Sequence, residues 1–195
     1  KRLFGKWFKN PDSWKAWFAC LSAMFALQDS EDYLSFYKSH TGRTEWPTTP
    51  AKEAWLIVGR RGGKSLIASL TALYLTAFKD YSAYLAPGEI ATAMVIATDR
   101  AQARVIMRYV NGFIDNIPML AKMVKRRTEE TIEFNNRTAI EVHSCSFRSV
   151  RGYTLCAVVA DEIAFWRADD SANPDKEILA AVRPGLATIP GSMLI

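Results

Sequence analysis

The sequence predicts an α/β fold in which a mostly parallel central sheet carries helices on both faces. Short apolar runs alternate with stretches whose apolar residues recur at helical spacing, as in strands buried between helix layers. The chain has 195 residues, 49% of them hydrophobic and 23% charged, so it can bury one core and disorder is not expected. We expect one domain over residues 1–195, with a helical extension and loop at 1–50 and the core at 51–195.

The extension contains two expected helices. Asp12 or Ser13 can cap the first, which reaches about Leu27, because the apolar residues of this stretch recur every three or four positions. The second is expected at about residues 30–39, before Gly42 and a polar loop that contains prolines.

The core alternates short strands with helices. Buried strands are expected at residues 54–58, 93–97 and 155–160, with the start of a fourth at 192–195. Helices are expected at 64–78, at 100–115 and from Pro174 onward.

Local signals define the ends of these elements. Thr98 or Asp99 can cap the helix at 100–115, and Ser171 or Asn173 can cap the helix that begins at Pro174. An alternating segment at 131–142 has two asparagines at its centre and is typical of a β-hairpin.

A glycine- and arginine-rich turn, GRRGGKS, follows the first expected strand and opens the helix at 64–78. It is either a loop that holds phosphate or a basic turn between two core elements. The usual phosphate loop has a further glycine at the position that Val58 occupies here. The strand–turn–helix context favours phosphate, because it points backbone N–H groups inward at a helix N-terminus. The candidate nucleotide-binding residues are Gly59, Arg60, Arg61, Gly62, Gly63, Lys64 and Ser65.

An acidic pair, Asp161-Glu162, ends the strand at 155–160 and supports the phosphate-loop interpretation. Lys64 would reach the β- and γ-phosphates of a nucleotide, and Ser65 and Asp161 would hold Mg²⁺. Glu162 would orient and deprotonate the attacking water. Because a small-molecule kinase must exclude water, a base in this position favours a hydrolase.

The order of these elements narrows the fold. The strand at 93–97 lies in sequence between the phosphate loop and Asp161. By analogy between folds, this order matches the additional-strand (ASCE) type of P-loop NTPase, which includes helicases, translocases and packaging motors.

Further motifs point to one family. Arg60 stands four residues before Lys64, and an Arg-Gly pair, Arg151-Gly152, lies about ten residues upstream of the acidic pair in VVADE. Gln102-Ala103 lies within VIATDRAQARVI, and HTGRTEWP precedes the first expected strand. From about residue 41 to 195 the chain resembles the ATPase domain of the large terminase subunit of tailed bacteriophages, the motor that pumps DNA into procapsids.

The resemblance implies a Mg²⁺-dependent ATPase that drives viral double-stranded DNA into the procapsid. It assigns Arg60 to the subunit's own ATP and Arg151 to the ATP of a neighbouring subunit, with Arg148 as a nearby substitute. The implied catalytic residues are Glu162, Arg151 and Arg60, and the implied metal ligands are Ser65 and Asp161.

The resemblance also implies partners and a location. The partners are double-stranded DNA, the portal protein and the small terminase subunit, with a homo-oligomeric ring on the portal and a monomer for the fragment alone. No membrane is involved, and the protein would act in the host cytoplasm at the procapsid portal, not in the mature virion. The family's coupling motif and nuclease domain are expected beyond Ile195.

Three questions stay open at this point. A DNA or RNA helicase-type motor is the alternative enzyme, and a nucleotide-binding module without turnover is the alternative class, although Glu162 argues against a module. The net charge of +5 permits a polyanionic partner, and the cluster at 125–127 is either a nucleic-acid contact or a solvated face. Arg43, Trp46 and the loop at 41–50 are the candidates for adenine contact.

Overall fold

The computed structural model describes residues 3–27, 31–145, 150–167 and 173–195. The chain divides into two compact units, residues 1–54 and 55–195. In the described ranges, no helix combines the length and apolar character that crossing a bilayer requires.

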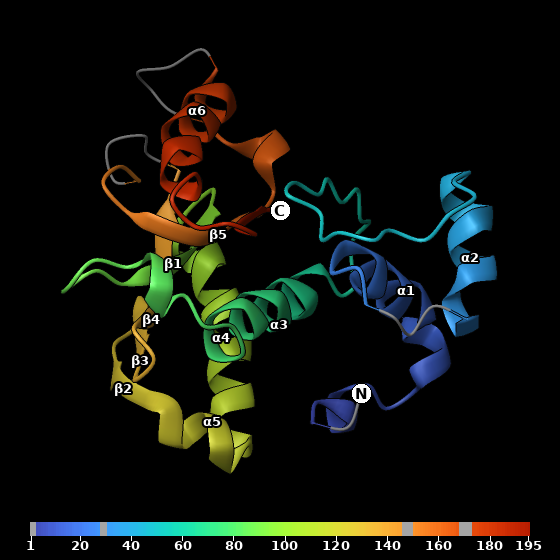
Figure 1. Ribbon diagram of the computed structural model, residues 1–195, viewed down its shortest axis with the longest axis horizontal. Coiled ribbons are helices and arrows are strands. Elements are labelled where there is room, and N and C mark those ends of the chain that lie inside the picture. The colour runs from blue at the N-terminus through green and yellow to red at the C-terminus, as the bar shows by residue number, and fades with distance from the viewer. Residues whose placement is uncertain (1–2, 28–30, 146–149, 168–172) are drawn as a thin grey trace. The chain divides into compact units, whose positions relative to one another are not determined.

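The first unit is built from short helices (Figure 1). These are η1 (Gly5–Trp7), η2 (Pro11–Trp14), α1 (Lys15–Met24) and α2 (Glu31–Thr41). The predicted caps of the first helix are wrong, because Asp12 and Ser13 lie in the 3-10 helix η2 and Trp14 is the N-cap of α1. The Ser13 hydroxyl donates to the Asn10 carbonyl at 2.7 Å instead of accepting a helix N–H.

Both α-helices of this unit end in the left-handed region. The first ends at Met24, earlier than predicted, because Ala26 has a φ of 49° and the Leu27 N–H bonds back to the Ser22 carbonyl. The second is followed by Gly42 with a φ of 69°, as the predicted helix end requires.

The second unit contains a sheet of six strands among the described residues, in the order β2-β3-β4-β1-β5-β6. The strands are β1 (Ala91–Ala97), β2 (Val124–Arg127), β3 (Thr131–Phe134), β4 (Thr138–Ser144), β5 (Thr154–Ala160) and β6 (Met193–Leu194). The β4-β1-β5-β6 part is parallel, and β2 and β3 join antiparallel at the β4 edge. The predicted mostly parallel sheet and the hairpin at 131–142 are confirmed.

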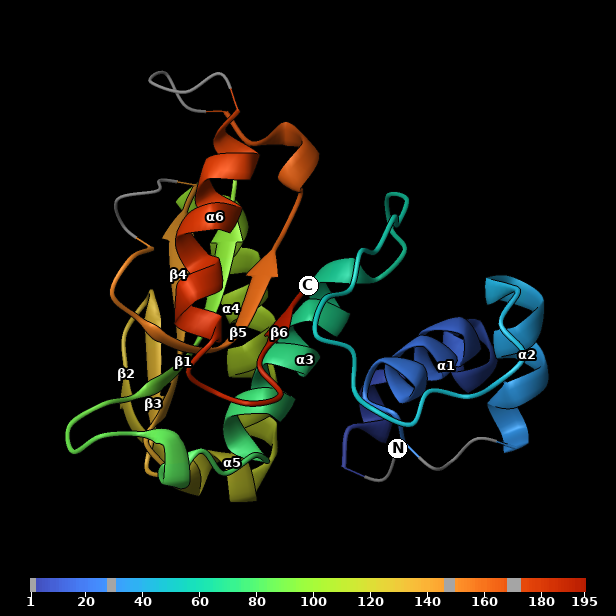
Figure 2. The ribbon, with the colours of Figure 1, turned by 45° about the horizontal axis from the view of Figure 1, so that its top comes forward.

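Helices cover both faces of this sheet (Figure 2). On one face α3 (Lys64–Ala77) and α4 (Arg100–Asn116) pack against each other and against β1 and β4, and on the other α6 (Pro174–Leu186) packs against β5. Every residue of β1 is buried. Side chains alternate across a strand, so Met94 and Ile96 of β1 reach the α6 side, where they share a core cluster with Val182.

The remaining elements are short. They are α5 (Pro118–Met123), η3 (Ser82–Tyr84) and η4 (Ile163–Phe165). Asp99, rather than Thr98, caps α4, because its carboxylate accepts the Gln102 N–H at 2.8 Å. Asn173 occupies the N-cap position of α6, and Ser171 lies outside the described residues.

The predicted strand at 54–58 is wrong. These residues are not a strand and pair with none of the described strands of the sheet, and Trp55 and Ile57 are 63% and 103% exposed. An apolar run becomes a strand only where another strand offers hydrogen-bond partners. Neither β2 nor α5 was expected from the sequence pattern.

Candidate nucleotide-binding and active site

The turn at residues 59–65 is tight and leads directly into α3. The Gly62 N–H donates to the Gly59 carbonyl at 3.2 Å, and Gly63, with a φ of 82°, is the N-cap of the helix. A Cβ on Gly62 would lie 2.5 Å from Cγ1 of Val58 and 3.0 Å from the Gly59 carbonyl oxygen. The backbone therefore requires glycine at both positions before Lys64.

The N-terminus of α3 has the properties of an anion site. The helix has 14 residues and no acidic side chain in its first turn. The first N–H groups of a helix lack partners within it and carry partial positive charge, so they favour phosphate. Lys64 and Ser65 are the first two residues of α3, which adds an ammonium and a hydroxyl to this end of the helix.

Lys64 brings together the two motifs that the sequence analysis singled out. Its Nζ lies 2.5 Å from Oε1 of Glu162 and 3.6 Å from Oδ1 of Asp161, although Glu162 is 98 positions away in the sequence. The side chains of Asp161 and Glu162 are 12% and 27% exposed, so the cluster is partly shielded from water. The turn and the acidic pair thus form one candidate site.

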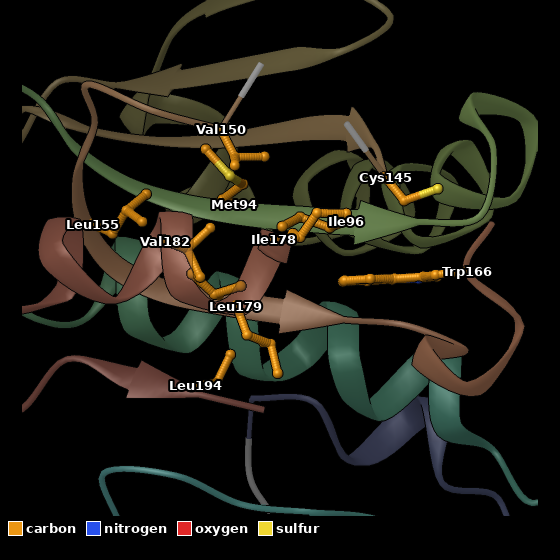
Figure 3. Packing of buried hydrophobic residues seen from close by; sticks show 11 residues of the cluster. Met94, Ile96, Cys145, Val150, Leu155, Trp166, Ile178, Leu179, Val182 and Leu194 are labelled. Carbon is orange, nitrogen blue, oxygen red and sulfur yellow. The ribbon is translucent and has the colours of Figure 1, made fainter. Parts of the chain in front are cut away.

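The backbone around Glu162 is held in an uncommon conformation. The Asp161 N–H continues the sheet by donating to the Ile96 carbonyl at 2.8 Å, and Glu162 then turns into the left-handed region with a φ of 54°. The Trp166 indole donates to the Asp161 carbonyl at 2.9 Å, and its ring is buried in the core cluster (Figure 3). Such conformations persist at functional sites when the surroundings fix them.

The charge of Asp161 depends on its surroundings. Burial raises the pKa of this carboxyl above its usual value, Lys64 opposes the rise, and the negative charge of Glu162 adds to it. A second cation beside Asp161 would favour the ionised form. The site therefore suits a ligand that brings positive charge with it.

The donor set fits Mg²⁺. The hydroxyl of Ser65 and the carboxylate of Asp161 are hard oxygen donors, and magnesium in nucleotide sites takes few protein ligands besides phosphate and water. Within the described ranges, no three His, Cys, Asp or Glu side chains come together as an all-protein metal centre.

The predicted arginines fall in different places. Arg60 and Arg61 are exposed in the turn, and Arg61 adopts a φ of 60°. Arg151 precedes β5 and the acidic pair follows it, so the seven residues of β5 separate them by about 20 Å. Figure 2 shows the segment before β5 at one end of the strand and η4 beyond the other. Arg148 lies outside the described residues.

The other candidate residues come from two different parts of the chain. Arg43 and Trp46 belong to the first unit, where Arg43 donates to Tyr37 and the Trp46 indole donates to the Leu27 carbonyl, and adenine contact stays a prediction. The basic cluster lies on the edge strand β2, where all three side chains pair with Glu133 or Asp115.

Two residues that hold the backbone beside predicted functional residues had no sequence signal. Trp166 fixes the carbonyl of Asp161, and Tyr153 packs between β4 and α6 beside the Arg-Gly pair. Neither belongs to a motif: the ring of Trp166 is placed by the core cluster, and Tyr153 is placed by His143 and Gly185. Only the apolar or aromatic character of these positions was visible.

Known proteins resemble this chain in sequence and in fold. A family model described as "Terminase large subunit, ATPase domain" matches residues 47–193. The crystal structure of the HK97 bacteriophage large terminase is similar with a TM-score of 0.55 and 16% identity, over 75% of this chain and 29% of that chain. A mutant ATPase domain of the Thermus phage P74-26 large terminase gives a TM-score of 0.54 and 19% identity, over 89% of this chain and 66% of that chain.

At such low sequence identity the structural similarity shows a shared fold, which is the P-loop ATPase fold of the additional-strand type. The chain spans less than a third of the HK97 protein and just under two thirds of the Thermus phage chain. A search of curated proteins found no match. Because the family model covers well over half of the residues, the chain belongs to the family of terminase large subunit ATPase domains.

Proposed function

We propose that this domain binds Mg-ATP at the turn 59–65 and hydrolyses it to drive double-stranded DNA into a procapsid. The observation that carries the proposal is the meeting of Lys64 with Asp161 and Glu162 at the N-terminus of α3. A P-loop ATPase needs these three groups in one place: a cation for the phosphates, an acid for the metal and a base for water.

Each residue has a defined task in this proposal. The turn and the first N–H groups of α3 hold the phosphates, with Lys64 at the β- and γ-phosphates. Ser65 and Asp161 hold Mg²⁺, which would neutralise charge that develops on the phosphates. The phosphates compete with Glu162 for Lys64, and the released carboxylate then orients a water and accepts its proton.

The arginines divide between two copies of the chain. Arg60 lies in the turn and serves the nucleotide of its own subunit. Arg151 stands at the other end of β5, about 20 Å from the acidic pair. It is therefore suited to the ATP of a neighbouring subunit, where an arginine beside the γ-phosphate is worth about 10³–10⁵ in rate. We extend the proposal to a homo-oligomeric ring on this basis.

The remaining partners follow from the family. The ring acts on the portal protein with the small terminase subunit, in the host cytoplasm at the procapsid portal and not in the mature virion. The net charge of +5 is compatible with a DNA partner.

One experiment separates this function from its alternatives. The full-length protein should hydrolyse ATP faster with double-stranded DNA and, with procapsids, protect that DNA from added nuclease. Lys64→Ala should abolish both activities, and Lys79→Ala, which removes an exposed lysine just after α3, should retain them. Strand displacement without protection would establish the helicase-type motor instead, and nucleotide binding without turnover would establish the module.

A further inference from the structure

Arg151 lies on a short turn that is anchored on both sides. Val150, directly before it, is 1% exposed and belongs to the core cluster with Met94 and Leu155 (Figure 3). Gly152 follows with a φ of 82°, so the chain turns sharply before Tyr153. Arg151 itself is exposed and borders an open hollow of about 430 Å³ beside α6.

Tyr153 is held to the sheet by two residues of β4. Its ring meets the His143 ring edge to face with centroids 5.4 Å apart, and the Glu141 carboxylate interacts with its hydroxyl closely enough to raise the pKa of Tyr153. Nε2 of His143 lies 3.3 Å from Oε2 of the same carboxylate. Glu141 and His143 are two positions apart on one strand, so both face Tyr153 from the same side of the sheet.

The pKa shifts of Glu141 and Tyr153 favour an interaction between the two side chains. The hydrogen bond from His143 lowers the pKa of Glu141, burial opposes the change, and the hydrogen bond from Tyr153 lowers the pKa further. Burial, followed by the charge of Glu141, raises the pKa of Tyr153 to about 12. Near neutral pH the neutral hydroxyl of Tyr153 therefore faces a charged carboxylate, a pairing that favours a charge-assisted hydrogen bond.

The backbone of Tyr153 is held from the opposite side by α6. A Cβ on Gly185 would lie 2.6 Å from the Tyr153 carbonyl oxygen and 3.0 Å from Cδ1 of Leu155. Glycine at position 185 thus permits an approach that any other residue would prevent. Tyr153 is fixed between β4 and α6, two positions after the exposed arginine.

We propose that Tyr153 is the positioning residue for Arg151, and that with Glu141, His143 and Gly185 it aims the guanidinium at a phosphate bound by a second copy of the chain. The inference rests on the role of Arg151 proposed above. Its physical basis is that a transition-state contact contributes only when the group arrives in the right geometry, since a displacement of about 1 Å can cost about 10²-fold in rate.

Mixed rings of the full-length protein test the proposal, because they show which subunit carries a defect. Tyr153→Ala should lower kcat on the order of 10²-fold without changing the KM for ATP, since its own nucleotide site is intact. Lys64→Ala subunits should restore activity to it by supplying a well-placed Arg151. Arg151→Ala subunits should not, because neither partner then offers a usable arginine.

Two milder variants guard against a folding defect. Tyr153→Phe keeps the ring contact and loses only the hydroxyl, so it should show the same pattern with a smaller loss in kcat. Gly185→Ala adds a Cβ that would displace the Tyr153 carbonyl, so this variant should also lose kcat and be restored by Lys64→Ala subunits. Gly112→Ala is the matched control, because Gly112 lies in α4 with nothing within 4 Å of an added Cβ, and it should leave kcat unchanged.

Three results would overturn the inference: wild-type kcat in Tyr153→Ala, failure of Lys64→Ala to restore it, or restoration by Arg151→Ala. The second would place the defect in the fold or the nucleotide site of the variant itself. The reference mixture of Lys64→Ala with Arg151→Ala should be active. If that mixture co-assembles and stays inactive, the trans role of Arg151 is wrong, and the positioning role falls with it.

Discussion

Two apolar runs of this chain read alike in sequence and differ in structure. Residues 55–58 and residues 155–160 are both short and apolar, and each directly precedes residues of the candidate site. The second run is β5, bonded to β1 on one side and β6 on the other, with Leu155 fully buried. The first pairs with no described strand, and Ile57 is fully exposed. Apolar composition permits a strand, but hydrogen-bond partners decide whether one forms.

Because only the second run is part of the sheet, the acidic pair that follows it is held by more contacts than the turn that follows the first run. Asp161 and Glu162 are fixed by the sheet, by η4 and by the buried Trp166. The turn at 59–65 is held by its own Gly59–Gly62 hydrogen bond and by the start of α3. We therefore expect the acidic half to be preorganised for chemistry and the turn to acquire its final order when phosphate binds.

The largest effect is expected on the preorganised half. Glu162→Gln keeps the shape of the side chain and removes its ability to accept a proton, so the rate of ATP hydrolysis by the full-length protein should fall by about 10²–10⁴-fold. Nucleotide affinity should change little. Phosphate release and nucleotide titration measure the two quantities, with Glu129→Gln, an exposed glutamate, as the control. Normal turnover in Glu162→Gln would remove this residue as the base.

A matched pair of leucines tests the structural contrast directly. Leu155→Ala leaves a cavity in the core and should lower the free energy of unfolding by about 2–5 kcal/mol. Leu56 is 38% exposed in the unpaired run, and Leu56→Ala should change that free energy by less than about 0.5 kcal/mol. Denaturant titration with a common m-value measures both. Equal losses would mean that residues 55–58 are packed like a core strand in solution.

Much of the fold and the site could be predicted from the sequence because the signals are local. The residues of each motif are adjacent in sequence: Gly62, Gly63 and Lys64 in the turn, and Asp161 and Glu162 after β5. The runs at 93–97 in β1 and 155–160 in β5 are apolar throughout and buried almost completely. The wrong predictions concern groups whose hydrogen-bond partners the sequence does not specify. The hydroxyl of Ser13 bonds backward to Asn10, and residues 55–58 find no strand beside them. Contacts such as that of Tyr153 with Gly185 join residues distant in sequence and depend on a fold that local spacing does not contain.

Substitutions in the turn should mainly change the affinity for nucleotide. Lys64→Ala removes a charge-assisted bond to phosphate, worth about 1.5–3 kcal/mol, so the affinity for Mg-ATP should fall about tenfold or more. Calorimetric titration measures it, with Lys79→Ala as the charge-matched control. Unchanged affinity in Lys64→Ala would exclude the turn as the phosphate site. A large loss of folding stability in the same variant would contradict the weaker structural role assigned to the turn.

The smallest expected effect is a pH-dependent change in the free energy of unfolding from Glu141, the β4 residue that faces Tyr153 just before β5. The pKa of Glu141 is lower in the fold than in the unfolded chain, chiefly through its hydrogen bond with His143. Between the two pKa values the unfolded chain binds more protons, so the stability from this carboxylate is present above the unfolded value of about 4.3 and is lost as pH falls through the folded pKa.

Glu141→Gln cannot ionise, so it should be less stable than the wild type at neutral pH, and the difference should shrink as the pH falls below about 4.3. Urea titrations at a series of pH values measure the difference, with Glu129→Gln as the control that should leave the slope unchanged. A gap that stays constant down to the lowest pH would mean that the carboxylate charge does not support Tyr153. The fixed start of β5 would then depend on the ring contact with His143 and the close approach of Gly185 alone.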